Sequence, residues 1–127
     1  MVGKNEYIYE ELTYKIIGCS YEVHRNLGSI HKENIYHNAL VQEFTHVELP
    51  FSEEKSIPVE YKGKRVGVYK PDFIIDEKVI LEIKAVPFVT KAMTEQIYYY
   101  AKGTRYKLVL LINFGTRKVG IKRLIYT

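Results

Sequence analysis

The chain has 127 residues, of which 46% are hydrophobic and 27% charged, enough to bury one core and too few to form two domains comfortably. The single cysteine, Cys19, excludes an internal disulfide, and the absence of a leader or a long apolar run predicts a cytoplasmic protein that does not enter a membrane. The net charge of +4 mildly favours polyanionic partners. We therefore expect a single domain over residues 1–127.

Two helices are predicted at the start of the chain. Between Glu6 and Leu27 the apolar residues recur every three or four positions, which is the spacing of one helical face. Gly28 suits a left-handed residue at the end of that helix, and Ser29 could cap a second one. The apolar stripe of this second helix contains Ile35, Tyr36, Ala39, Leu40 and Phe44.

Strand-forming residues dominate most of the rest of the chain. Segments 57–63 and 64–76 predict two strands joined near Gly63, and segment 78–86 is so continuously apolar that it predicts a central strand covered on both faces. Helical composition returns from Thr90 to Lys102 and ends at Gly103, before two further strands over 106–115 and 118–126. The predicted element order of this α/β protein is ααβββαββ.

Three charged residues interrupt the apolar segments 69–76 and 78–86: Asp72, Glu82 and Lys84. If the loop between the two strands holds three residues, 76–78, Asp72 faces Glu82 and Lys84 lies on the same side of the sheet. With a two-residue loop, Asp72 moves to the other face. The proximity of the two carboxylates therefore depends on the register of this hairpin.

In the first register the two carboxylates predict a metal site. Mutual repulsion and burial would raise a pKa unless a cation neutralised the pair. Oxygen ligands from Asp72, Glu82 and the backbone carbonyl of Ile83 suit Mg²⁺ or Mn²⁺ better than zinc. Such a metal lowers the pKa of a bound water, and Lys84 could orient that water or stabilise a pentavalent transition state. The reaction implied is phosphodiester hydrolysis.

A purely structural interpretation is also open. Asp72 follows Pro71 at the start of a strand, and Glu82 and Lys84 could form an ion pair on one half-exposed face. The neighbouring residues favour a site instead, because unpaired charge is costly among apolar side chains. These neighbours are Phe73, Ile74, Ile75, Ile80, Leu81 and Ile83.

The spacing from Pro71-Asp72 to Glu82-Ile83-Lys84 resembles the PD-(D/E)xK motif of restriction-endonuclease-like nucleases, and Gln96 and Tyr100 resemble the QxxxY element of RecB-like members. From about residue 12 to 125, the blocks "EVHRNLGSIHKENIYHNAL", "VEYKGKRVGVYKPDFIID", "VILEIKAV", "TEQIYYYAKGTRYKLVLLINFG" and "IKRLI" are similar, in order, to the GxxExxY proteins of that superfamily. The chain departs from the family's pattern at Ile30, where those proteins have glycine.

The resemblance implies a central mixed sheet flanked by helices, with Asp72, Glu82 and Lys84 as the catalytic residues and Gln96 assisting them. It also implies that Glu33 completes the metal shell through water, although a carboxylate in the first turn of a helix is favourable without any metal. Gln96 could instead be a solvated helix residue, and Tyr100 a core aromatic.

His24 is a further candidate ligand, because some RecB-like nucleases use a helix histidine, but a lone histidine is more often structural.

The implied partner is nucleic acid, DNA in the first instance, and the chain could form a homodimer. Two other functions remain open: a module of the same fold that binds nucleic acid or a protein without cutting, and a structural or regulatory dimer. Basic residues on two predicted hairpins could grip phosphates or simply protect strand edges. They are Lys62, Lys64, Arg65 and Lys70 on one, and Arg117, Lys118, Lys122 and Arg123 on the other.

Overall fold

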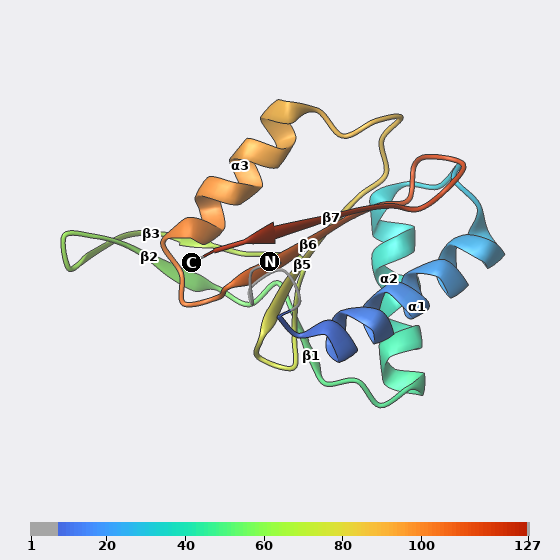
Figure 1. The fold of residues 1–127 in the computed structure, drawn as a ribbon, viewed down its shortest axis with the longest axis horizontal. Helices are drawn as coiled ribbons and strands as arrows, with labels where there is room; N and C mark the ends of the chain where they lie inside the picture. Colours follow the sequence, from blue (N-terminus) through green and yellow to red (C-terminus); the bar gives the residue numbers. More distant parts are fainter. Residues whose placement is uncertain (1–7, 127) are drawn as a thin grey trace, which may run out of the picture.

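The computed structural model describes residues 8–126. Along the chain two helices precede five strands, and a third helix separates these from two more strands (Figure 1). The elements are α1 (Glu10–Leu27), α2 (Glu33–His46), β1 (Phe51–Glu53), β2 (Ile57–Tyr61), β3 (Lys64–Tyr69), β4 (Phe73–Ile75), β5 (Val79–Lys84), α3 (Lys91–Lys102), β6 (Leu108–Asn113) and β7 (Gly120–Ile125).

The main sheet is mixed, with the strand order β1-β4-β5-β6-β7. The pair β5–β6 is parallel and the other neighbours are antiparallel, because α3 carries the chain over the sheet between β5 and β6. Helices α1 and α2 lie on one side of this sheet and α3 on the other (Figure 1). This arrangement confirms the predicted restriction-endonuclease-like α/β class.

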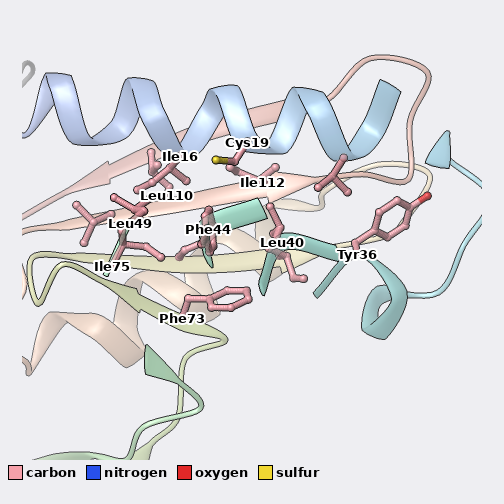
Figure 2. Close-up of a cluster of buried hydrophobic side chains, with 14 of the residues drawn as sticks. Ile16, Cys19, Tyr36, Leu40, Phe44, Leu49, Phe73, Ile75, Leu110 and Ile112 are labelled. Carbon is pink, nitrogen blue, oxygen red and sulfur yellow. The ribbon is translucent and has the colours of Figure 1, made fainter. Parts of the chain in front are cut away.

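A hydrophobic cluster covers each face of the sheet. The first joins α1 and α2 to one face, and Figure 2 shows Phe44 and Leu40 of α2 beside Phe73 of β4. The second packs α3, through Ile97 and Ala101, on the opposite face. Strand β5 contributes side chains to both clusters, so it is central and covered on both sides, as its continuous apolar run predicts.

The strands differ from the prediction in two ways. The predicted strand 64–76 is broken at Lys70 and Pro71 into β3 and β4, which belong to different sheets. Proline has no N–H to donate to a ladder, so a strand is easily interrupted there. Strand β1 was not predicted, because three residues of mixed polarity carry no recognisable alternation. The observed order is therefore ααβββββαββ rather than ααβββαββ.

Strands β2 and β3 form a separate two-stranded sheet, which extends away from the main sheet (Figure 1). Its turn contains Lys62 and Gly63, with φ angles of 49° and 79°. Two successive positive φ values match the right-handed twist of a hairpin, which explains why the predicted turn falls at this glycine.

The ends of the helices were predicted with mixed success. The third helix ends before Gly103, as predicted, and Thr90 caps its start by accepting a hydrogen bond from the Met93 N–H at 3.1 Å. The expected cap Ser29 is wrong, because α2 begins at Glu33 after Lys32. The predicted start of the first helix, Glu6, lies outside the described residues.

No helix within residues 8–126 is both long and apolar enough to cross a membrane.

Candidate active site

The β4–β5 hairpin has the register that brings the two predicted carboxylates together. Phe73 pairs with Leu81 and Ile75 with Val79, so the loop is the three-residue one and Asp72 falls opposite Glu82. The backbone N–H of Asp72 donates to Oε1 of Glu82 at 2.7 Å, and the N–H of Ile83 donates to Oδ2 of Asp72 at 2.8 Å. Each carboxylate is therefore fixed by the other strand's backbone.

Burial makes this carboxylate pair electrostatically costly. It raises the pKa of Glu82 to about 7, with the charge of Asp72 as the second cause. Burial is also the main reason that the pKa of Asp72 is raised, against the opposing effect of the Ile83 hydrogen bond. Carboxyl groups with raised pKa values in a cleft are typical of functional sites.

Lys84 lies on the same face of β5 as Glu82, two residues further along the strand. Its positive charge lowers the pKa of both Asp72 and Glu82, so it lies within electrostatic range of the pair. In the part of the chain that the structure describes, however, no ion pair within 4.0 Å joins it to either carboxylate. The Glu82–Lys84 ion pair of the structural interpretation is therefore not observed.

Asp72 also faces a pocket of about 440 Å³ on the side of α2. The pocket is acidic, and its lining residues come from α2, from the end of β1 and from the start of β4: Glu33, Asn34, His37, Asn38, Glu53, Glu54 and Asp72. Partial desolvation and then the charge of Asp72 raise the pKa of Glu33. The first residue of α2 thus lies in the same pocket as Asp72, whereas Glu82 does not line this pocket.

His37 is a site residue that the sequence analysis did not select. It stacks on Phe73, with ring centroids 4.3 Å apart, and its Nε2 lies 2.8 Å from Oε1 of Glu53. A positive charge at this position would lower the pKa of both Asp72 and Glu33. The sequence did contain one signal for His37, because a residue four positions after Glu33 lies on the same face of a helix. Without the fold, however, nothing showed that this face points toward Asp72.

Gln96 and Tyr100 are exposed on α3 and reach the carboxylates only through a third residue. The Gln96 amide donates to the Tyr100 hydroxyl at 2.9 Å. The centroid of the Tyr100 ring lies 5.3 Å from that of the Tyr69 ring. Tyr69 is buried, and burial is the main cause that raises the pKa of its phenol. The second cause is the charge of Glu82, so the Tyr69 hydroxyl lies near this carboxylate. The exposed Tyr100 is not the core aromatic that its spacing suggested.

Tyr69 was also absent from the predicted site. Its hydroxyl is buried and has no hydrogen-bond partner of ordinary length and angle, although Glu82 is nearby. The alternation of side chains along β3 did not indicate that Tyr69 lies near Glu82. Glu82 belongs to the main sheet, which the chain enters only after the break at Pro71.

His24 and Ile30 lie outside this pocket. His24 Nε2 is 2.9 Å from the carbonyl oxygen of Thr116, which supports a structural role. Ile30, at the position where the resembling proteins have glycine, is 86% exposed in the turn between α1 and α2. Gly28 supplies the positive φ of 71° in that turn, and its carbonyl accepts a 2.6 Å hydrogen bond from the buried Tyr36 hydroxyl.

The donor set fits a hard divalent cation. Asp72 and Glu82 offer carboxylate oxygens, both with raised pKa values, and a cation would offset their repulsion. Among residues 8–126 no group of three or more His, Cys, Asp or Glu side chains converges on one metal position. The protein would therefore supply few direct ligands, and water would complete the shell, as is usual for Mg²⁺.

The fold is thus that of an α/β protein whose mixed sheet is covered by helices on both faces and carries two paired carboxylates and a lysine on its central hairpin. The family model described as the PD-(D/E)XK nuclease superfamily matches residues 10–124. The chain therefore belongs to this superfamily, which supports a nuclease-type function acting on nucleic acid, and such nucleases generally use divalent metals. No curated protein and no solved structure shows significant similarity to the chain.

Proposed function

We propose that this protein is a metal-dependent nuclease that hydrolyses phosphodiester bonds in DNA. The observation that carries this proposal is the half-buried pair Asp72 and Glu82, joined across β4 and β5, with Lys84 on the same face. Unneutralised carboxylates are costly in a buried site, and a bound cation with a phosphate would offset that cost.

In this proposal Asp72, Glu82 and the carbonyl of Ile83 hold Mg²⁺ or Mn²⁺, and Glu33 acts on the shell through water. The metal, when bound, supplies Lewis-acid polarisation of the phosphate and a more acidic water. Lys84 directs its ammonium to the water or to the charge that develops on the phosphate. Gln96 assists the catalytic residues from α3, which lies on the same side of the sheet as Glu82, through its hydrogen bond to the Tyr100 hydroxyl.

DNA is the proposed substrate because proteins of the fold that the sequence resembles cut DNA. Those proteins act on branched junctions, single-stranded ends and ordinary duplexes, and a shared fold does not select among these. The test therefore uses a panel of linear, single-stranded and branched DNA, with an RNA of matched sequence.

The test compares cleavage by the wild type with that by Asp72→Asn and Lys84→Ala. The hairpin loop supplies matched controls in Asp76→Asn and Lys78→Ala, which make the same charge changes in the turn between β4 and β5. We expect cleavage that requires Mg²⁺ or Mn²⁺, a loss of at least 100-fold in the two site variants, and near-normal activity in the controls. Unchanged cleavage by Lys84→Ala would show that the proposed mechanism is wrong.

Calorimetry with Mn²⁺ separates this function from that of a silent binding module. Metal binding that disappears in Asp72→Asn, together with cleavage by the wild type, supports the nuclease. Binding of metal and DNA without cleavage of any substrate in the panel would instead support a nuclease-fold module that recognises nucleic acid without cutting it.

A further inference from the structure

The β2–β3 hairpin exposes basic and apolar side chains together. Every residue from 61 to 68 is exposed, and the hairpin carries three basic side chains against one acidic one, Glu60. The basic residues are Lys62, Lys64 and Arg65, and Lys70 follows directly after β3. Much of the net charge of +4 is thus concentrated on one projecting element.

The fold gives no structural reason for this composition. Basic side chains alone would fit the protection of an open sheet edge. Protection does not explain why Tyr61 and Val66 are 61% and 64% exposed on the same short hairpin. A two-stranded sheet is also marginally stable by itself, and the outer part of this one is exposed throughout residues 61–68. An exposed patch that mixes positive charge with apolar surface is typical of a binding surface.

The hairpin is held in a fixed position relative to the carboxylate site. At its base, Ile57 and Tyr69 pair with each other and are buried in the cluster beneath α3. The chain then passes through Lys70 and Pro71 directly to Asp72. Anything bound along the hairpin is therefore positioned with respect to Asp72 and Glu82.

The arrangement of side chains suits a phosphate backbone. Tyr61 pairs with Lys64 across the turn, and the Lys62 ammonium lies 5.3 Å from the centroid of the Tyr61 ring. Lysine and arginine neutralise phosphates, and an adjacent exposed ring can lie against sugars or bases. An acidic protein surface would also match the charge, but a phosphate backbone places a charge every ~3.4 Å along each strand and so offers a partner to each of these three closely spaced cations.

We propose that the β2–β3 hairpin is a DNA-binding arm that grips the phosphate backbone beside the bond to be cut. This inference rests on the proposed function, and it adds the position of the DNA on the protein surface. Lys64 precedes Asp72 by eight residues, so at about 3.4 Å per strand residue it lies within roughly 27 Å of the site. The arm therefore contacts phosphates up to about eight base pairs from the cut.

The test is DNA binding by the triple variant Lys62→Gln, Lys64→Gln, Arg65→Gln. The matched control is Arg117→Gln, Lys118→Gln, Lys122→Gln, which removes the same charge from exposed positions in the β6–β7 connection and in β7, outside the β2–β3 hairpin. Fluorescence anisotropy with a labelled 30-base-pair duplex, without divalent metal, measures affinity at several salt concentrations and is independent of cleavage. Thermal unfolding of each variant checks that the fold is kept.

We expect the hairpin variant to bind at least ten-fold more weakly, and its slope of log affinity against log salt to be shallower by about 2.7, which is 0.9 for each of three phosphate contacts. The control should change either quantity far less. Equal losses in both variants, normal binding by the hairpin variant, or no binding by the wild type would each overturn the inference. Hairpin-dependent binding without any cleavage would uphold the arm and count against the nuclease.

Discussion

At the scale of single residues, two buried tyrosines differ in how their hydroxyls are satisfied. The Tyr36 hydroxyl donates to the Gly28 carbonyl at 2.6 Å and accepts from the His31 N–H at 3.2 Å. The Tyr69 hydroxyl is buried beside Glu82 without a hydrogen bond of ordinary geometry. A buried polar group without a partner costs free energy, whereas a satisfied one is costly to remove.

These two tyrosines therefore give opposite predictions for the same substitution. Tyr36→Phe should lower the free energy of unfolding by about 1–3 kcal/mol, because it leaves backbone groups of the α1–α2 turn without a partner. Tyr69→Phe should leave the free energy of unfolding unchanged or raise it by up to about 1 kcal/mol. Urea unfolding of both variants measures the difference. A loss of 1 kcal/mol or more in Tyr69→Phe would show that Tyr69 bonds to Glu82 in solution.

Part of the site is predictable from the sequence at this scale, because strand alternation is a local property. The alternation predicted two possible registers for the β4–β5 hairpin, and only the three-residue loop brings Asp72 opposite Glu82. The structure has this loop. Glu33 came only from resemblance to a family, since nothing local places the start of a helix beside a distant strand. His37 and Tyr69 were missed for the same reason: their neighbours, Phe73 and Glu82, belong to other elements.

At the scale of elements, the loops after β5 and β6 are fastened together just beyond Lys84. The buried Asn113 amide accepts from the Val86 N–H at 3.1 Å and donates to the Val86 carbonyl at 3.0 Å. The N–H of Phe114 also donates to the Lys84 carbonyl at 2.8 Å. Gly115 lies so close to this crossing that an added Cβ would collide with the backbone of Val86 and Ala85.

Gly115→Ala should therefore destabilise the protein and disturb the position of Lys84. Backbone cannot move aside as a flexible side chain can, so we expect a loss of about 1–3 kcal/mol in the free energy of unfolding. Gly67→Ala is the matched control, because a Cβ at Gly67 meets nothing within 4 Å. Chemical denaturation of the two variants tests this, and equal stability would mean that the two loops are more loosely packed than the structure shows.

The same scale shows where sequence patterns are informative. The long amphipathic helix α1 and the apolar strand β5 were predicted because each has a strong period or a continuous apolar run. Strand β1 and the break between β3 and β4 were not predicted, because both depend on the pairing of strands that lie apart in the sequence. The structural interpretation placed the start of a strand after Pro71, but only the observed pairing shows that the chain changes sheets there.

At the scale of the whole molecule, the carboxylate site makes stability depend on pH. The pKa of Glu82 rises from 4.5 in the unfolded chain to about 7 in the fold, and those of Asp72 and Glu33 rise as well. Between these values the folded protein holds more protons than the unfolded chain, so its stability falls as the pH increases. Below about pH 4.5 the effect of Glu82 vanishes, and above about pH 7 its full cost is present.

Without metal, we therefore expect the free energy of unfolding to decrease from pH 5 to pH 8, by on the order of 3 kcal/mol at most for Glu82. Glu82→Gln should flatten this dependence, whereas Glu77→Gln, in the exposed hairpin loop, should not. Adding Mg²⁺ should restore stability at pH 8 and have little effect at pH 5, because only the ionised carboxylates bind the cation. Denaturant unfolding with EDTA or Mg²⁺ across this range measures both effects. A wild-type profile as flat as that of Glu82→Gln would mean that the pair is far better hydrated than its burial indicates, which would remove the electrostatic argument for a metal at this site.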